Sequence, residues 1–373
     1  MRSSHNPSFM KAKPPHSIHI GCIGGLVIVL FLFSCSSISL TQRGSPLEEE
    51  SALPPTYSMV FIIHGDGDYL YHDTQGNARR ADEEALIEAT MVAEQNPQAE
   101  VFIFHERHRR HTLLFFPRRD GRFYYYRHGR LIAKESYWRD QGPSRFDPEI
   151  KLYQRFHKAV QPQPVRLFLY FGHEIPEFDG AGYDASYSHR TFTVDDLADG
   201  LKHITPDSTK FDLIVLSTCF NGTPHTIAAL APYARTIVAS PDNLHLSYFD
   251  LQPFERLDVG LQDGDMAAFT KAFARQSFDR LTEDIQTAVT VAVYDVDRVQ
   301  EFLHAVDSSY ENTLTTLKGQ KPGSFEHCDC AEDPAYVLSG MSEGVDLFYR
   351  PPRFGRLKHK QNHSGWECWR LLK

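Results

Sequence analysis

Apolar runs alternate with amphipathic segments along most of this chain. The runs that predict buried strands are residues 59–63, 99–106, 165–174, 211–218, 234–240 and 287–295. The segments with helical spacing are residues 79–97, 148–160, 193–204, 223–231, 265–278 and 296–306. Strands that alternate with helices in this order predict an α/β fold, in which a mainly parallel sheet is flanked by helices on both faces.

Capping residues mark where two of these helices begin. Thr193 has an N-cap side chain, and Asp196 follows three residues later, as in a capping box. Thr223 stands directly before Pro224, which suits the first turn of a helix. The second of these helices therefore starts five residues after Cys219.

The composition divides the chain into four parts. Residues 1–34 have the pattern of a leader, and residues 35–57 are polar and Pro-containing, as is typical of a flexible tether. Residues 58–310 hold the α/β alternation, with an inserted β-hairpin at 111–133 that we expect to turn at Asp120-Gly121. The pattern weakens afterwards, so residues 311–373 are predicted to form a loop-rich tail.

The leader resembles that of an exported lipoprotein. Arg2, Lys11 and Lys13 precede an apolar run of about 16 residues. The residues before Cys35 read Leu-Phe-Ser, and Leu-x-small-Cys resembles the bacterial lipobox, in which the cysteine is acylated. We therefore expect Cys35 to anchor the protein to a membrane of the bacterial cell envelope, on its periplasmic or surface side. An uncleaved anchor and an ordinary signal peptide are the alternatives.

Charge argues against nucleic acid as a partner. The formal net charge is −9, and it becomes −12 when the leader, with three basic and no acidic residues, is removed. Residues 105–130 are an exception, because they contain eight arginines, two acids and interleaved aromatic residues. Single-stranded nucleic acid or anionic glycans could bind such a segment. A hairpin with one solvated face explains it more simply, and a membrane-tethered protein suits nucleic acid poorly.

The cysteines suggest one disulfide and one candidate nucleophile. Either Cys328 or Cys330 could pair with Cys368 in an oxidising compartment. A zinc site would need more ligands at better spacing. Cys219 lies far from the others in the sequence and has no evident disulfide partner.

Two polar residues stand at the ends of two predicted strands. His173 follows the run at 165–171, and Cys219 follows the run at 211–217, 46 residues later with one helix between. One β-α-β crossover would bring both strand ends to the same edge of the sheet, where α/β proteins place their chemistry. A cysteine and a histidine at such an edge suit thiol nucleophilic catalysis. The amino end of the helix from Pro224 would favour the thiolate.

Other sites are less well supported by the sequence. Residues 64–73 contain histidines and aspartates that could bind a metal, but a polar turn after a strand explains them more simply, so we expect no metal site. The chain has no G-x-S-x-G around a nucleophile, which argues against an α/β-hydrolase. It also lacks the glycine-rich loops of nucleotide-binding enzymes.

The stretches LFLYFGHE and DLIVLSTCFNG resemble the clostripain-like cysteine peptidases, a branch of the caspase and gingipain superfamily. MVFIIHGDGDYL and TVAVYDVDRVQEF are similar to further segments of that family, so the likeness spans roughly residues 57 to 305. The resemblance implies a caspase-like fold and a cysteine endopeptidase that cleaves proteins or peptides through a Cys219–His173 dyad and an acyl-enzyme. The backbone N–H groups of Glu174 and Cys219 would hold the oxyanion. No cofactor is expected, although the resemblance alone implies that calcium is possible.

Two departures from the family pattern weaken this hypothesis. Relatives have Gly after the histidine, where this chain has Glu174. Relatives also have Asp two residues before the cysteine, which is implied to bind a basic P1 side chain, where this chain has Ser217. Asp242 is a candidate to supply the missing acid. The alternative is a catalytically inactive lipoprotein of the same fold that binds peptides or envelope partners.

Overall fold

The computed structural model describes most of the chain after the leader. The described residues are 53–72, 75–112, 116–178, 184–205, 209–244, 248–257, 261, 265–321 and 323–372. Cys35 and the rest of the expected leader lie outside them. Within the described part, no helix combines the length and the apolar character that a membrane crossing requires.

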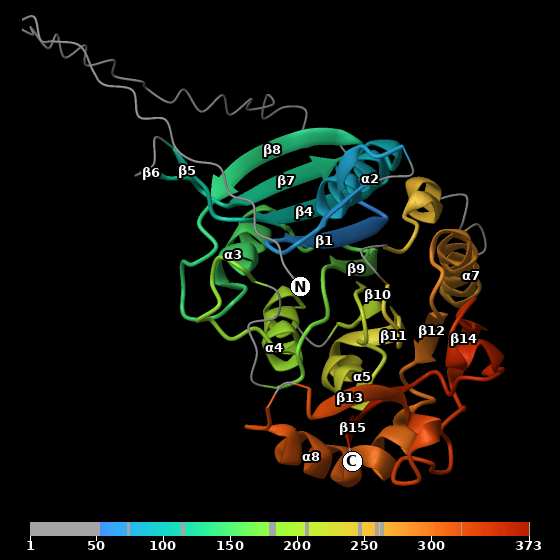
Figure 1. The fold of residues 1–373 in the computed structure, drawn as a ribbon. Coiled ribbons are helices and arrows are strands. Elements are labelled where there is room, and N and C mark those ends of the chain that lie inside the picture. The colour runs from blue at the N-terminus through green and yellow to red at the C-terminus, as the bar shows by residue number, and fades with distance from the viewer. Residues whose placement is uncertain are drawn as a thin grey trace, which may run out of the picture. The chain divides into compact units, whose positions relative to one another are not determined.

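One large sheet organises the described residues (Figure 1). Its strands, in spatial order, are β14 (Val345–Arg350), β12 (Val289–Asp295), β11 (Ala234–Ala239), β10 (Phe211–Ser217), β9 (Val165–Phe171), β1 (Tyr57–Gly65), β4 (Ala99–Arg107), β7 (Gly121–Arg127) and β8 (Arg130–Tyr137). The five strands from β11 to β4 are parallel neighbours. β12 and β14 on one side, and β7 and β8 on the other, run antiparallel. The predicted mainly parallel sheet is therefore confirmed.

Helices cover both faces of this sheet. They are α2 (Ala81–Gln95), α3 (Asp147–Phe156), α4 (Val194–Ile204), α5 (Pro224–Leu230), α7 (Met266–Asp284) and α8 (Gln300–Leu317), with short 3-10 turns at η2 (Ala231–Tyr233), η3 (Gln252–Arg256), η4 (Cys330–Glu332) and η5 (Arg356–His359). Ile214 and Leu216 of β10 pack into one apolar cluster with residues of α3, α4, α5 and α8. Leu213 and Val215 pack into the other with residues of α2 and α7. Side chains are thus buried on both faces, which explains the nearly continuous apolar strands.

The capping residues act as predicted. The Thr193 side chain accepts a hydrogen bond from the Asp196 N–H, and the Asp196 carboxylate accepts one from the Thr193 N–H. The Thr223 side chain accepts the N–H of Thr226 at the start of α5. Both helices are thereby fixed at the end that faces the same edge of the sheet as the ends of β9 and β10.

The hairpin turn predicted at Asp120-Gly121 is wrong. β7 and β8 are joined instead at His128-Gly129, where both residues have positive φ, 54° and 72°. Two successive positive φ angles suit the tight right-handed twist of a two-residue hairpin. Asp120 is buried and accepts hydrogen bonds from the Tyr187 hydroxyl and the Arg139 N–H, so it acts as a packing residue.

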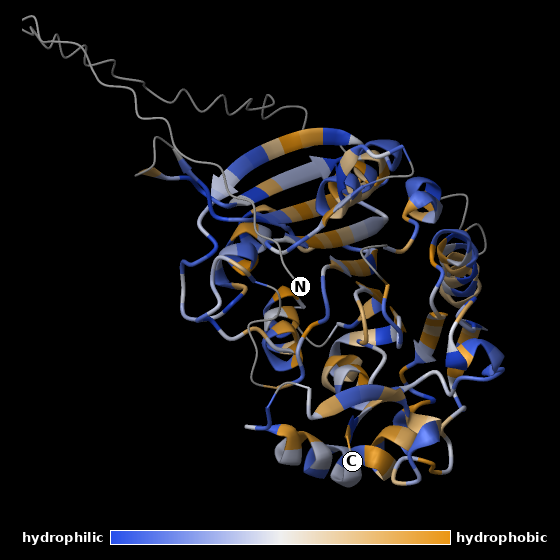
Figure 2. Cartoon of the chain, viewed as in Figure 1, coloured by the Kyte–Doolittle hydropathy of each residue, from blue (hydrophilic) through white to orange (hydrophobic). Residues whose placement is uncertain are grey.

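β8 forms one edge of the sheet, and two apolar side chains near its start are exposed. Leu131 and Ile132 are 48% and 46% exposed. Figure 2 shows that β8 carries hydrophobic positions among hydrophilic ones. Charged Arg130 and Lys134 flank them on the same strand. Such charges discourage edge-to-edge pairing with another chain.

The carboxyl-terminal region contains more structure than the predicted loops. Residues up to Leu317 continue α8, and β14 joins the main sheet beside β12. A separate antiparallel pair, β13 (Phe325–Asp329) and β15 (Glu367–Leu371), carries the Cys330–Cys368 disulfide at one end. Further short pairs are β2 (Leu70–His72) with β3 (Ala78–Arg80), and β5 (His111–Thr112) with β6 (Phe116–Pro117).

Candidate active site

The carboxyl ends of β9 and β10 lie side by side (Figure 1). Phe171 pairs with Ser217 where the two strands end, and the N–H of Gly172 donates to the Ser217 carbonyl at 3.3 Å. His173 and Cys219 each stand two residues beyond this last pair, so they occupy equivalent positions at one sheet edge. The strands are neighbours as expected, and the catalytic role of the two residues remains a prediction.

Tyr69 holds His173 from one side. The two rings stack with centroids 4.4 Å apart and planes 24° apart, and the Tyr69 hydroxyl accepts the His173 backbone N–H at 2.9 Å. Burial lowers the pKa of His173, and a hydrogen bond with the backbone of Asp68 partly opposes this effect. An imidazole with a lowered pKa is neutral near pH 7 and can accept a proton.

Cys219 is partly exposed and lies in a polar setting. Its Sγ donates to Asn243 Oδ1 at 3.3 Å and accepts the Leu244 N–H at 3.3 Å. A backbone N–H directed at sulfur stabilises negative charge there. The thiol is therefore placed in surroundings that suit a nucleophile better than those of a core cysteine.

The residues that follow His173 and Cys219 both contact β13. The Glu174 carboxylate lies 3.1 Å from Nε2 of His327, and the Phe220 ring stacks on the same imidazole at 4.1 Å. Phe220 has φ of 53°, which is strained for a residue with a side chain. The Glu174 side chain is thus engaged by the carboxyl-terminal strands, while the predicted role of its N–H in oxyanion binding is left as a prediction.

Ser217 is buried at the end of β10. Its hydroxyl oxygen accepts the Phe249 N–H at 2.9 Å, so the residue fixes the segment that follows β11. Ser217 also lines a small hollow with Phe171, Tyr248 and Phe249. This hollow is largely apolar, and Ser217 adds no charge to it.

The backbone of Asp242 contacts the loop that carries Cys219 and Phe220. Its carbonyl accepts the Phe220 N–H at 3.3 Å, one residue after Cys219. Its carboxylate accepts a hydrogen bond from Thr290 on β12. The structure therefore brings the Asp242 backbone close to the loop that carries Cys219. The Asp242 carboxylate is instead hydrogen-bonded to Thr290 of β12. Its predicted part in substrate binding stays a prediction.

A buried network of charges fixes the turn after β1. Arg139 has no exposed side-chain surface and donates to Asp66 at 2.6 Å and to Asp184 at 2.9 Å. Arg145 lies 2.8 Å from Glu106 and 2.9 Å from Asp184. The two arginines are strongly paired, which lowers the pKa of Glu106 to about 2 despite its burial.

This network also explains the cluster of polar residues at 64–73. Burial lowers the pKa of His64 to about 3, so the residue is neutral. The Asp66 carboxylate accepts hydrogen bonds from Arg139 and from the Ser186 backbone and hydroxyl. Because a cation already neutralises Asp66, this turn does not fit a calcium site. Across the described ranges, no group of three or more His, Cys, Asp or Glu residues is arranged to hold a metal ion.

Sequence reasoning missed Tyr69, Asn243 and His327. Tyr69 and Asn243 contact His173 and Cys219, but each lies on a different segment from the residue it contacts. His327 belongs to the region that was predicted to be loops. The position of Tyr69 directly after the HGDGD turn was the one available signal, because that turn follows the strand next to β9.

The comparisons with known proteins agree with this geometry. Residues 172–333 match the model of the clostripain family, Peptidase_C11, and the matched range includes His173, Cys219 and Asp242. The structure resembles an inactive zymogen C11 protease from Parabacteroides distasonis, with a TM-score of 0.54, 13% identity, and coverage of 85% of this chain and 92% of that one. No curated protein matches the chain.

A second solved structure is a secreted C11 cysteine protease from Bacteroides thetaiotaomicron with an irreversible peptide inhibitor. It has a TM-score of 0.46, 12% identity, and coverage of 74% of this chain and 73% of that one, too low to inform the fold. The family match confirms the resemblance predicted from the sequence, and the Parabacteroides structure confirms the caspase-like fold. A cysteine peptidase is the enzyme class that this family match supports.

Proposed function

We propose that this clostripain-like chain is a cysteine endopeptidase in which Cys219 is the nucleophile and His173 transfers the protons. One observation carries the proposal. The β9–β10 register places His173 and Cys219 at equivalent positions beyond the last paired residues, Phe171 and Ser217. A thiol and a neutral imidazole at one sheet edge are the groups that thiol catalysis requires.

The reaction follows from these positions. His173 takes the proton from the Cys219 thiol, and the thiolate sulfur attacks the carbonyl carbon of the scissile peptide bond. The oxyanion of the tetrahedral intermediate is held by the backbone N–H groups of Cys219 and Glu174. The C–N bond then breaks as His173 protonates the leaving amine. Water hydrolyses the resulting thioester and restores the thiol.

Tyr69 and the Asp68 backbone would keep the imidazole in place during these steps. Both lie on the turn that the buried Arg139–Asp66 pair fixes. The charge of Asp68 also raises the pKa of His173. The proposed catalytic unit is the Cys219–His173 dyad. Ser217 adds no negative charge to the hollow that it lines, and a preference for basic P1 residues is therefore not part of the proposal.

The test uses the purified chain, a mixed peptide library and mass spectrometry under reducing conditions. We expect Cys219→Ala and His173→Ala each to lower kcat/KM by at least about 10³-fold. Cys328→Ala is the matched control, because Cys328 also lies outside the disulfide and burial raises its pKa to about 12. Equal inertness of the parent and both dyad variants would favour the non-catalytic alternative.

The non-catalytic alternative has one observation in its favour. Glu174 occupies the place of the glycine expected after the histidine, and its carboxylate is paired with His327. Glu174→Gly distinguishes the two functions. A latent peptidase would gain activity from this change, whereas a peptide-binding protein would stay inert and bind library peptides without cleaving them.

The leader supports a membrane tether as part of the same proposal. We propose that Cys35 is acylated and that the enzyme works at a membrane of the bacterial cell envelope, on proteins or peptides outside the cytoplasm. Metabolic palmitate labelling should mark the parent and fail to mark Cys35→Ala. Labelling that persists in the variant would contradict the tether. Activity unchanged by a calcium chelator would agree with an enzyme that needs no cofactor.

A further inference from the structure

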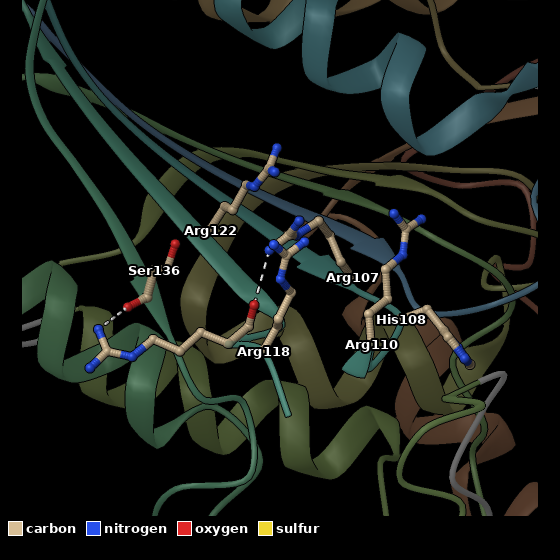
Figure 3. Close-up of a pocket in the computed structure, with 7 residues that line it drawn as sticks. Arg107, His108, Arg110, Arg118, Arg122 and Ser136 are labelled. Carbon is tan, nitrogen blue, oxygen red and sulfur yellow. Dashed lines mark hydrogen bonds between the residues drawn. The ribbon is translucent and has the colours of Figure 1, made fainter. Parts of the chain in front are cut away.

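Five arginines converge on one cavity that the proposed peptidase reaction does not use. The cavity measures about 460 Å³ and is lined by Arg107, His108, Arg110, Arg118, Arg119, Arg122 and Ser136. Figure 3 shows the labelled arginine side chains extending into one region from the end of β4, from the segment before β7 and from β7.

Backbone pairing holds these arginines together. The Arg107 N–H donates to the Asp120 carbonyl, and the Arg118 N–H donates to the Arg110 carbonyl, both at 2.8 Å. Arg122 lies opposite Ser136 in the β7–β8 ladder. Arg107 and Arg122 thus lie on strands of the main sheet, and Arg110 and Arg118 are held by backbone pairing beside β5 and β6.

The arginines have no carboxylate partner within 4 Å among the residues that the structure describes. Their visible contacts are to backbone oxygens: Arg107 donates to the Arg119 carbonyl at 3.0 Å, and Arg119 donates to the Ser136 carbonyl at 2.8 Å. The two acids of this segment are used elsewhere. Glu106 pairs with Arg145, and Asp120 accepts from Tyr187.

The positive charges therefore repel one another across the cavity. Burial lowers the pKa of Arg107, and the nearby charge of Arg122 lowers it further. Tyr124 opposes this effect, and the smaller effects of Arg110 and Asp120 act in opposite directions. The whole chain has a formal net charge of −9, so general attraction of anions is unfavourable and only the local field can bind one. An anion in the cavity would relieve this repulsion.

We propose that this cavity binds a compact ligand that carries two or more phosphate groups. Guanidinium groups match phosphate oxygens in a bidentate geometry, and several converging arginines favour clustered phosphates over a single carboxylate. The phosphates can belong to a soluble molecule or to a lipid headgroup. A nucleic-acid strand is the less suitable ligand, because its single charges are spread along a polymer rather than gathered within one cavity.

Calorimetric titration of the full chain with tripolyphosphate at low salt tests the proposal. We expect saturable binding that weakens as salt rises, because the interaction is electrostatic. Arg110→Gln with Arg122→Gln should weaken binding at least tenfold. The matched control is Arg127→Gln with Arg130→Gln, which removes two arginines from the same hairpin outside the cavity lining and should change the affinity less than about twofold.

A single change, Arg118→Gln, provides a second test if the double variant fails to fold. Arg118 is exposed, and its loss should weaken binding about threefold at an unchanged melting temperature. Vesicles with phosphomonoester lipids, compared with zwitterionic vesicles, distinguish the ligand source. Arginine-dependent recruitment to the former identifies a lipid headgroup, whereas tripolyphosphate binding without recruitment identifies a soluble ligand.

Three results would overturn the proposal. The first is no saturable tripolyphosphate binding up to about 1 mM. The second is an equal loss of affinity in the cavity pair and in the control pair of variants. The third is a single-stranded oligonucleotide that binds more tightly than tripolyphosphate through the same arginines.

Discussion

Two sets of arginines on neighbouring parts of the chain differ in their burial and in their carboxylate partners. Arg139 and Arg145 are buried and surrounded by the carboxylates of Asp66, Glu106 and Asp184. Arg110, Arg118 and the other cavity arginines are partly or fully exposed and have no carboxylate within reach in the described ranges.

This difference in burial and in carboxylate partners distinguishes arginines that stabilise the fold from arginines that we propose bind an external ligand. Burying an ion pair costs desolvation energy, so the paired set is not explained by stability alone. Its use is positional, because Arg139 holds Asp66, and the turn that follows carries Asp68 and Tyr69 against His173. In the exposed set, the side chains of Arg107 and Arg119 bond backbone carbonyls of the same region, those of Arg119 and Ser136.

Removal of the buried charge should have the largest effect. Arg139→Met leaves Asp66 without its buried arginine, while Glu106 and Asp184 keep Arg145. We expect the free energy of unfolding to fall by about 3–5 kcal/mol, because a buried charge loses its partner. Urea denaturation measures it. Arg109→Met is the control, because Arg109 lies 3.9 Å from Asp140 with both side chains more than a third exposed, and it should cost under about 1 kcal/mol. An equal loss of unfolding free energy in both variants would contradict the contrast between buried and exposed arginines.

Glu149 gives an intermediate effect that depends on pH. Burial and the charge of Glu106 raise its pKa from 4.5 to about 7. The folded protein thus keeps a proton that the unfolded chain releases between these pH values, so stability falls as pH rises through this window. Glu149→Gln removes the titrating group and therefore this loss of stability at high pH. The variant should match the parent at pH 4 and be about 2–3 kcal/mol more stable at pH 8.

Chemical denaturation at both pH values measures this effect, with the exposed Glu94→Gln as a control. The control should show the same difference from the parent at both values. A Glu149→Gln variant that is less stable than the parent at pH 8 would mean that the buried carboxylate is ionised and satisfied by Arg145.

The exposed set should give the smallest effect on stability. Arg110→Gln removes one of several like charges and breaks no ion pair within the described residues, so the free energy of unfolding should change by less than about 0.5 kcal/mol. Any gain should appear at low salt and vanish at high salt. A loss above about 1 kcal/mol would show that this arginine supports the fold.

The parallel half of the molecule could be predicted from the sequence, and the edges could not. Buried strands such as β9 and β10 produce long apolar runs, and the caps at Thr193 and Thr223 are local signals. The turn at His128-Gly129 lacked the usual Asn-Gly or Asp-Gly pair, while Asp120-Gly121 mimicked one. The sequence did not predict β14, because its residues are only partly buried and form no long apolar run.

The same contrast holds for the candidate site. His173 and Cys219 follow the ends of predictable strands, so a crossover of one helix was enough to predict that they share one edge of the sheet. Their neighbours come from distant segments: Tyr69 lies 104 residues before His173, and Asn243 lies 24 residues after Cys219. The partner of Glu174, His327, is 153 residues away. Contacts of this kind depend on tertiary packing that no local pattern encodes.

Under the proposed function, the Cys330–Cys368 disulfide gives this chain two opposite redox requirements. Cys219 must stay a thiol to act as a nucleophile, while Cys330 and Cys368 must stay oxidised at the end of the strand pair whose His327 contacts both Glu174 and Phe220. A reductant strong enough to rescue an oxidised Cys219 could also loosen that pair. The concentration of reductant therefore becomes an experimental variable in its own right, with activity expected to pass through a maximum as it increases.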